Sequence, residues 1–197
     1  MITSVTIEGF KSFGIPAKPV SLGPLNFIVG ANASGKTNFV SALRFLHLAM
    51  TEGLEKAIAR PEFDGLWGIR NYMVFSKKRS GRRGSKPLAI SIRIKGPFPE
   101  QPISGTQTFH VEAAHYRLEI GFDDKTSRPF VAGETLEAQI RTSTAVSATY
   151  SLKRNEKSLE IKDPLNSDRP EHSAQVPASV RTRLSVEEWS FGLPALW

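Results

Sequence analysis

The eight residues from Gly30 to Thr37 have the types and the spacing that hold a phosphate group. They read G-A-N-A-S-G-K-T and fit the template G-x-x-x-x-G-K-[ST] at every fixed position. Small side chains let successive backbone N–H groups converge on phosphate oxygens. Lys36 would contact the β- and γ-phosphates, and the Thr37 hydroxyl would be a ligand of Mg²⁺. The predicted ligands are therefore ATP and Mg²⁺, held by Gly30, Ala31, Ala33, Ser34, Gly35, Lys36 and Thr37, with Lys36 as the catalytic cation and Thr37 as the metal ligand.

The elements on either side of this loop must position it. The apolar run before the loop predicts a buried parallel strand, formed by Leu25, Phe27, Ile28 and Val29. After the loop, apolar residues recur at helical spacing, so a helix is expected to begin near Lys36 and to end near Glu52 and Gly53. A second helix is expected at 54–59, before Pro61. Strand, loop and helix in this order predict an α/β fold of the P-loop NTPase class.

The second half of the chain has the period of a β-sheet. Apolar residues alternate with polar ones from residue 88 onward, as at Ile90, Ile92 and Ile94, and predict an antiparallel sheet with one face toward water. We expect a nucleotide-binding core at 1–60, a helical and basic linker at 61–87, an antiparallel β-rich lobe at 88–163, and a loop with a C-terminal segment at 164–197. Residues 164–177 are polar and contain prolines, which predicts a loop.

The segment GANASGKTN, residues 30–38, resembles the phosphate loop of ABC-type AAA ATPases of the RecF, structural-maintenance-of-chromosomes and OLD-like group. The opening ITSVTIEGFKSF is also similar to theirs, and GETLEAQI at 133–140 resembles a strand of OLD-like ATPases. The likeness is specific over residues 1–50, although Ala33 stands where that group commonly has glycine. It implies the N-terminal half of an ABC-type ATPase head and adds four nucleotide-site residues, namely Asn32, Asn38, Lys11 and Ser12. It further implies a homodimer or a partner head, and a role in DNA repair, chromosome maintenance or phage defence.

Composition limits the partners and the compartment. The net charge of +7 and the pI near 9.8 favour polyanionic partners. A basic segment at 76–86 is a candidate for DNA contact, although such segments are also ordinary solvated hairpin tips; its cations are Lys77, Lys78, Arg79, Arg82, Arg83 and Lys86. The chain has no Cys, no signal-peptide layout and no apolar run near the ~20 residues of a membrane span. We therefore expect a cytoplasmic protein without membrane contact.

The sequence lacks the motifs that would complete a hydrolytic site. Glu187 and Glu188 have no apolar strand before them, so they do not form a Walker B segment, and they are typical of a helix start instead. His110 and His115 are five residues apart, which does not fit a zinc-protease helix, so structural roles are expected. Three functions remain open. They are an ATPase that is active once a missing half or a partner head completes it, a nucleotide-binding module without turnover, and a small kinase. The kinase is the least favoured, because residues 1–24 precede the phosphate-loop segment.

Overall fold

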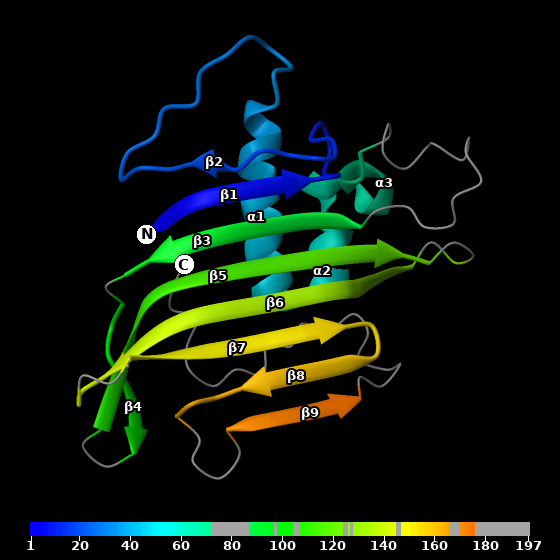
Figure 1. The fold of residues 1–197 in the computed structure, drawn as a ribbon. Helices are drawn as coiled ribbons and strands as arrows, with labels where there is room; N and C mark the ends of the chain where they lie inside the picture. The colour runs from blue at the N-terminus through cyan, green and yellow to red at the C-terminus, as the bar shows by residue number, and fades with distance from the viewer. Residues whose placement is uncertain are drawn as a thin grey trace.

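A computed structural model describes residues 1–71, 87–96, 98–104, 107–123, 126, 128–144, 147–165 and 170–175. In that part of the chain, nine strands form one antiparallel sheet in the order β2-β1-β3-β5-β6-β7-β8-β9, with β4 paired to β5 (Figure 1). The strands are β1 (Ile2–Glu8), β2 (Val20–Ser21), β3 (Leu88–Lys95), β4 (Gln101–Ser104), β5 (Gln107–Phe122), β6 (Pro129–Thr142), β7 (Ser147–Asn155), β8 (Ser158–Lys162) and β9 (Glu171–Gln175). The helices are α1 (Lys36–Glu52), α2 (Leu54–Ala59), the 3-10 helix η1 (Pro61–Phe63) and α3 (Gly65–Ile69).

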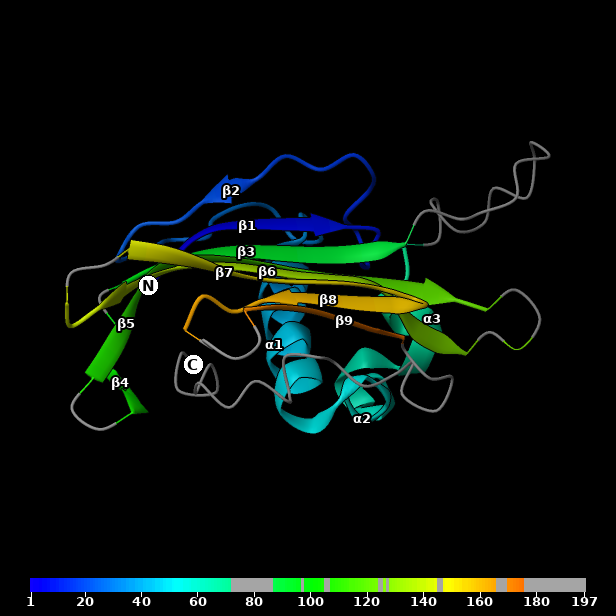
Figure 2. The ribbon, with the colours of Figure 1, turned by 60° about the horizontal axis from the view of Figure 1, so that its bottom comes forward.

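The helices α1 and α2 lie on one face of the sheet (Figure 2). Alternate apolar residues of the strands point to that face, and Ile90, Leu118 and Leu136 are fully buried there. The opposite face is polar, and on it Arg117 forms ion pairs with Glu8 at 2.9 Å and with Glu119. The predicted alternation, with one face toward water, is confirmed.

Helix α1 packs on the sheet through the face that its apolar spacing defines. Phe45 is fully buried at the centre of this face, and its ring contacts those of Phe10 and Phe63 at centroid distances of 5.7 Å and 5.3 Å. Both helix predictions are confirmed, since α1 spans Lys36–Glu52 and α2 spans Leu54–Ala59. The aromatic stack joins the end of β1 to the helix layer, and it thereby fixes the turn that follows β1.

The prediction of a buried parallel strand at 25–29 is wrong for this structure. Residues 25–30 have neither helix nor strand, and Leu25, Phe27, Ile28 and Val29 are exposed. Figure 1 shows why: after β2 the chain arches beyond the edge of the sheet and descends to the start of α1. The described strands pair with one another in antiparallel register, and none of them lies beside 25–29 as a parallel neighbour.

The loop prediction for 164–177 also needs correction. Residues 171–175 form β9, which pairs with β8 at the edge of the sheet. These residues lack apolar alternation, and the strand is held by its backbone pairing with β8.

Within the described residues, no helix is long and apolar enough to cross a membrane.

Candidate phosphate-binding site

The phosphate loop, residues 30–37, contains Lys36, whose side chain folds back onto the first residues of the loop. The Lys36 ammonium donates hydrogen bonds to the carbonyl oxygens of Gly30 and Ala31, both at 2.7 Å. These bonds draw the first two residues of the loop toward the start of α1, so the loop curls around the lysine side chain. Residues 30–34 are exposed, which leaves the rim of the loop open to a ligand.

Positive φ angles shape the loop at two further places. Gly35 has φ 94°, and a Cβ on it would lie 3.1 Å from the Ser12 hydroxyl oxygen, so a larger residue would be both strained and crowded. Ala33 has φ 63°, in the left-handed region that non-glycine residues adopt at a cost. Glycine would adopt this conformation without that cost.

The start of α1 is suited to an anion. Gly35 is its N-cap residue, and no side chain caps the helix. The first N–H groups of an α-helix have no partner within the helix, and a helix of 17 residues adds its positive dipole end at the same point. Thr37 is an exposed residue at the second position of the helix. Free amides, a lysine and a hydroxyl on one rim fit a nucleotide phosphate with Mg²⁺, which takes its remaining ligands from phosphate and water.

The turn after β1 contacts this helix start. The Asn38 side-chain amide donates a hydrogen bond of 2.8 Å to the Ser12 hydroxyl oxygen. Residues at the end of α3 and just after it also hold the turn. The Lys11 N–H donates to the Ile69 carbonyl oxygen, and the Asn71 side chain donates to the Lys11 carbonyl oxygen. The structure therefore brings together Ser12 and Asn38, two residues that only the family resemblance had put at the site.

Lys11 itself points elsewhere. Its ammonium lies 5.6 Å from the centroid of the Phe63 ring and 5.9 Å from that of Phe10, and it is 3.5 Å from the Glu62 carbonyl oxygen. In this arrangement its charge stabilises the aromatic stack. The predicted contacts of Lys11 and Asn32 with nucleotide stay predictions.

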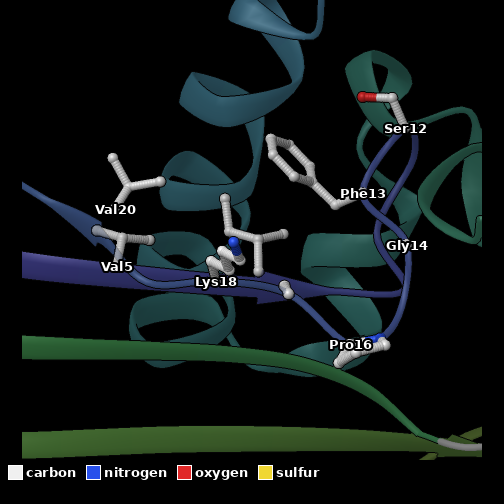
Figure 3. Close-up of a pocket in the computed structure, with 9 residues that line it drawn as sticks. Val5, Ser12, Phe13, Gly14, Pro16, Lys18 and Val20 are labelled. Carbon is white, nitrogen blue, oxygen red and sulfur yellow. The ribbon is translucent and has the colours of Figure 1, made fainter.

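A pocket of about 240 Å³ lies beside the turn. Its lining residues are Val5, Ile7, Ser12, Phe13, Gly14, Pro16, Ala17, Lys18 and Val20. In Figure 3, Val5, Phe13, Lys18 and Val20 surround the space, and Ser12 lies at the far end of the turn from Pro16. Ser12 thus belongs both to the pocket wall and to the hydrogen bond with Asn38 at the start of α1. Sequence reasoning missed this pocket, since its walls come from β1, the following turn and β2.

Several other predicted features lie outside this site. The basic residues Lys77, Lys78, Arg79, Arg82, Arg83 and Lys86, and the pair Glu187 and Glu188, fall outside the described residues. Where the chain is described, it contains no group of three or more His, Asp and Glu side chains that could hold a metal ion.

His115 lies on the polar face of the sheet, with its Nε2 atom 2.8 Å from the Ser91 hydroxyl. Its burial and the nearby Arg93 hold the pKa of this imidazole below the ordinary 6.5.

A buried polar cluster lies on the helix-facing side of the sheet. Glu134, within the segment 133–140 noted above, is fully buried in β6, where the Tyr116 hydroxyl donates to it at 3.1 Å and Arg154 lies 3.7 Å away. Burial, with Asp163 and Glu134 nearby, raises the pKa of the Tyr150 hydroxyl, so this phenol stays neutral. Sequence alternation puts Glu134 and Arg154 on the apolar face, and that signal alone could have identified the pair.

Comparison with known families gives one match that covers most of the chain. Residues 25–168 match the family described as "AAA domain, putative AbiEii toxin, Type IV TA system". The matched range contains the phosphate loop, α1 and the sheet strands from β3 to β8. No solved structure matches the chain.

A curated protein matches over a much shorter stretch. Urease accessory protein 2 of Cryptococcus neoformans var. grubii serotype A (strain H99) is 49% identical over 47 residues, which are 23% of this chain and 4% of that protein. The chain therefore spans a small fraction of that relative, and the activity in its name is not carried over.

Proposed function

Because this chain belongs to the AAA-domain family with the description "putative AbiEii toxin, Type IV TA system", a family of P-loop ATPases, we propose that it binds ATP and Mg²⁺ at residues 30–38. The observation that carries this proposal is the curled phosphate loop, in which Lys36 bonds to the carbonyl oxygens of Gly30 and Ala31 at the open start of α1. A phosphate group entering there meets the lysine and the free amides of the helix together.

The residues of the loop have separate roles in this proposal. The amides of residues 31–36 bind the β-phosphate, apart from that of Ser34, which donates to the Ala31 carbonyl oxygen. Lys36 neutralises charge on the β- and γ-phosphates. The Thr37 hydroxyl and phosphate oxygens hold Mg²⁺, which supplies electrostatic stabilisation of the phosphoryl group. Asn38 positions Ser12, and the pocket beside Ser12 receives the base and ribose of the nucleotide. Val5, Phe13 and Val20 give this pocket an apolar wall, which suits the face of a base.

Hydrolysis needs a group that orients the attacking water. Among the described residues, no carboxylate forms a hydrogen bond or an ion pair with residues 30–38. We therefore propose that turnover requires a further acidic residue, supplied by a partner head or by a further part of an ABC-type ATPase head. In that assembly, ATP binding and hydrolysis would be coupled to DNA repair, chromosome maintenance or phage defence in the cytoplasm.

The same observation favours a second candidate, a nucleotide-binding module that does not hydrolyse ATP. The loop and the pocket can hold a nucleotide without a catalytic carboxylate. A kinase is favoured less, since β1 and the turn after it precede the phosphate loop and contribute to the site.

The test is ATP binding and phosphate release by the purified chain with Mg²⁺, measured by titration calorimetry and a phosphate assay. Lys36→Ala should weaken binding by roughly a hundredfold or more, because a charge-assisted contact with phosphate is lost. Lys56→Ala is the matched control, since Lys56 is an exposed lysine on α2 away from the loop, and it should leave binding unchanged.

The two candidates give different results in the same experiment. Binding without turnover supports a site that awaits completion, and turnover on addition of a partner head then separates the ATPase from the non-hydrolysing module. Strong turnover by the chain alone would show that the missing carboxylate is already present. No binding by the wild-type chain would refute the proposal.

A further inference from the structure

A buried ion pair joins β6 to β7 on the helix-facing side of the sheet, and the proposed nucleotide site makes no use of it. Glu134 is fully buried, and the side chain of Arg154 is 3% exposed. The Arg154 Nη1 atom lies 3.7 Å from the Glu134 Oε2 atom, and the Tyr116 hydroxyl of β5 donates a hydrogen bond of 3.1 Å to Oε1. Two opposite charges are therefore held together in an apolar layer, with a phenol as the third partner.

Stability alone does not account for this pair. Two charges lose their hydration when they are buried, and their attraction often only offsets that loss, so apolar side chains of similar volume often give equal or greater stability. At 3.7 Å the closest contact is also longer than the about 2.7–3.2 Å of a good N–H···O hydrogen bond. Removal of one partner, by contrast, leaves an uncompensated buried charge, which is strongly destabilising. Such a pair therefore discriminates between arrangements that keep it and arrangements that break it.

Glu134 and Arg154 are direct partners in the register of β6 and β7. The other pairs on this face of the two strands are apolar, namely Leu136 with Leu152, Ala138 with Tyr150, and Ile140 with Ala148. A slip of one residue would turn the apolar side chains of β7 to the opposite face, but a slip of two residues would keep them toward the core. Apolar alternation therefore does not distinguish the observed register from one that is shifted by two residues.

The ion pair does make that distinction. A shift by two residues in one direction would place Glu134 opposite Leu152. A shift in the other direction would place Arg154 opposite Leu136. Either shift moves the two charges roughly 7 Å apart along the strands, at about 3.4 Å per residue, so a buried charge then faces a leucine. The observed register is the one that places the two charges directly opposite each other.

We propose that the Glu134–Arg154 pair fixes the register of β7 on β6. The Tyr116 hydroxyl anchors the carboxylate to β5, the neighbouring strand on the other side of β6. The strands β7, β8 and β9 pair in succession (Figure 1), so a slip between β6 and β7 would move all three along the sheet. The pair thus sets the position of this outer part of the sheet, which apolar alternation leaves open.

The first measurement is the midpoint of urea unfolding without nucleotide. The double variant Glu134→Leu with Arg154→Met should have a midpoint equal to or above that of the wild-type chain, because apolar side chains replace the pair. Arg154→Met alone should lower the midpoint, since it leaves a buried carboxylate without its cation. The exposed pair of Arg141 and Glu112, 2.6 Å apart, is the control, and replacement of both by Gln should leave the midpoint nearly unchanged.

The register itself is measured by disulfide cross-linking within the chain, which has no cysteine of its own. Gln139 and Thr149 are exposed direct partners on the polar face, so Gln139→Cys with Thr149→Cys reports the observed register. Glu137→Cys with Thr149→Cys reports a shift by two residues, and Gln139→Cys with Ser151→Cys reports the opposite shift. In the observed register these last two pairs are diagonal neighbours about 7–8 Å apart, which exceeds the roughly 4.4–6.8 Å between the Cα atoms of a disulfide.

The wild-type chain should cross-link under mild oxidation through the first cysteine pair only. In the apolar double variant, the ratio of native to shifted cross-links should fall by roughly tenfold or more, because a slip no longer breaks a buried ion pair. The exchanged variant, Glu134→Arg with Arg154→Glu, is the matched control. It keeps opposite charges at the same two positions, so it should cross-link as the wild-type chain does.

Three results would overturn the proposal. Cross-linking through the first cysteine pair alone in the apolar double variant would show that packing or the connection between the strands fixes the register. A double variant that unfolds at a lower urea concentration than the wild-type chain, or that is unfolded by circular dichroism, would show that the pair stabilises the fold instead. Shifted cross-links in the wild-type chain would show that the pair does not hold the register. No nucleotide is present, so the outcome is independent of the proposed ATP site.

Discussion

Replacing Ala33 by glycine should stabilise the phosphate loop. Ala33 has φ 63°, and the left-handed conformation costs an L-residue with a Cβ atom about 1–2 kcal/mol. Glycine removes this cost, but it also makes the unfolded chain more flexible, which lowers the free energy of unfolding by about 0.4–1 kcal/mol. The net change is a gain of about 1 kcal/mol or slightly less.

Ala31→Gly is the matched control within the same loop. Ala31 is also exposed, but its φ is not positive, so glycine there brings the entropy cost without relief of strain. The two variants should therefore differ in their free energy of unfolding by about 1–2 kcal/mol. Equilibrium unfolding in urea, followed by circular dichroism, measures both values.

Nucleotide affinity gives a second measure of the same effect. An exposed loop that adopts another backbone conformation without nucleotide has no strain at Ala33 in the free protein. The left-handed conformation is then formed only on binding, and its cost reduces the free energy of binding. Ala33→Gly should then bind ATP up to roughly fivefold more tightly, since 1 kcal/mol corresponds to about that factor. Equal destabilisation by Ala33→Gly and Ala31→Gly, with no gain in affinity, would refute the left-handed conformation at Ala33.

Two further predictions concern the core and the polar face of the sheet. Phe45→Ala should lower the free energy of unfolding by about 3–5 kcal/mol, because it leaves a cavity between two other rings, and Phe45→Leu should lower it by less. Urea unfolding measures both values, and a loss below about 1 kcal/mol for Phe45→Ala would contradict the aromatic stack. The pKa of His115 is lowered in the folded state, so below pH 6.5 the unfolded state binds more protons and the stability falls as the pH decreases. His115→Gln should reduce this fall between about pH 7 and pH 5, and an unchanged pH profile of the unfolding midpoint would show that the imidazole titrates normally.

The parts of the fold that follow from local pattern could be predicted from the sequence. The helical spacing of apolar residues predicted α1 and α2, and the alternation of apolar and polar residues predicted the long strands with one solvent-exposed face. Both patterns depend on which side of an element is buried. The phosphate loop followed from residue types alone, since its chemistry depends on backbone amides and on Lys36.

The remaining features depend on what lies next to each segment, which a single sequence does not state. The run at 25–29 is apolar enough for a buried strand, but burial also requires neighbouring strands, and the described chain supplies none. Residues 171–175 form β9 without apolar alternation, since an edge strand needs only the backbone of β8. The bond between Ser12 and Asn38 joins residues 26 positions apart, so it could be inferred from the family resemblance but not from spacing.

The pairing of β1 with β3 has a consequence for the order in which the protein folds. Residues 2–8 find their partner strand at 88–95, so about 80 residues must be synthesised before the first strand can pair along its length. At 5–20 residues per second, this delay is on the order of 4–16 s. Throughout that time the apolar β1, α1 and the phosphate loop have no sheet to pack against. A ribosome-bound chain that ends before β3 should therefore be open to proteolysis across the entire phosphate-binding region.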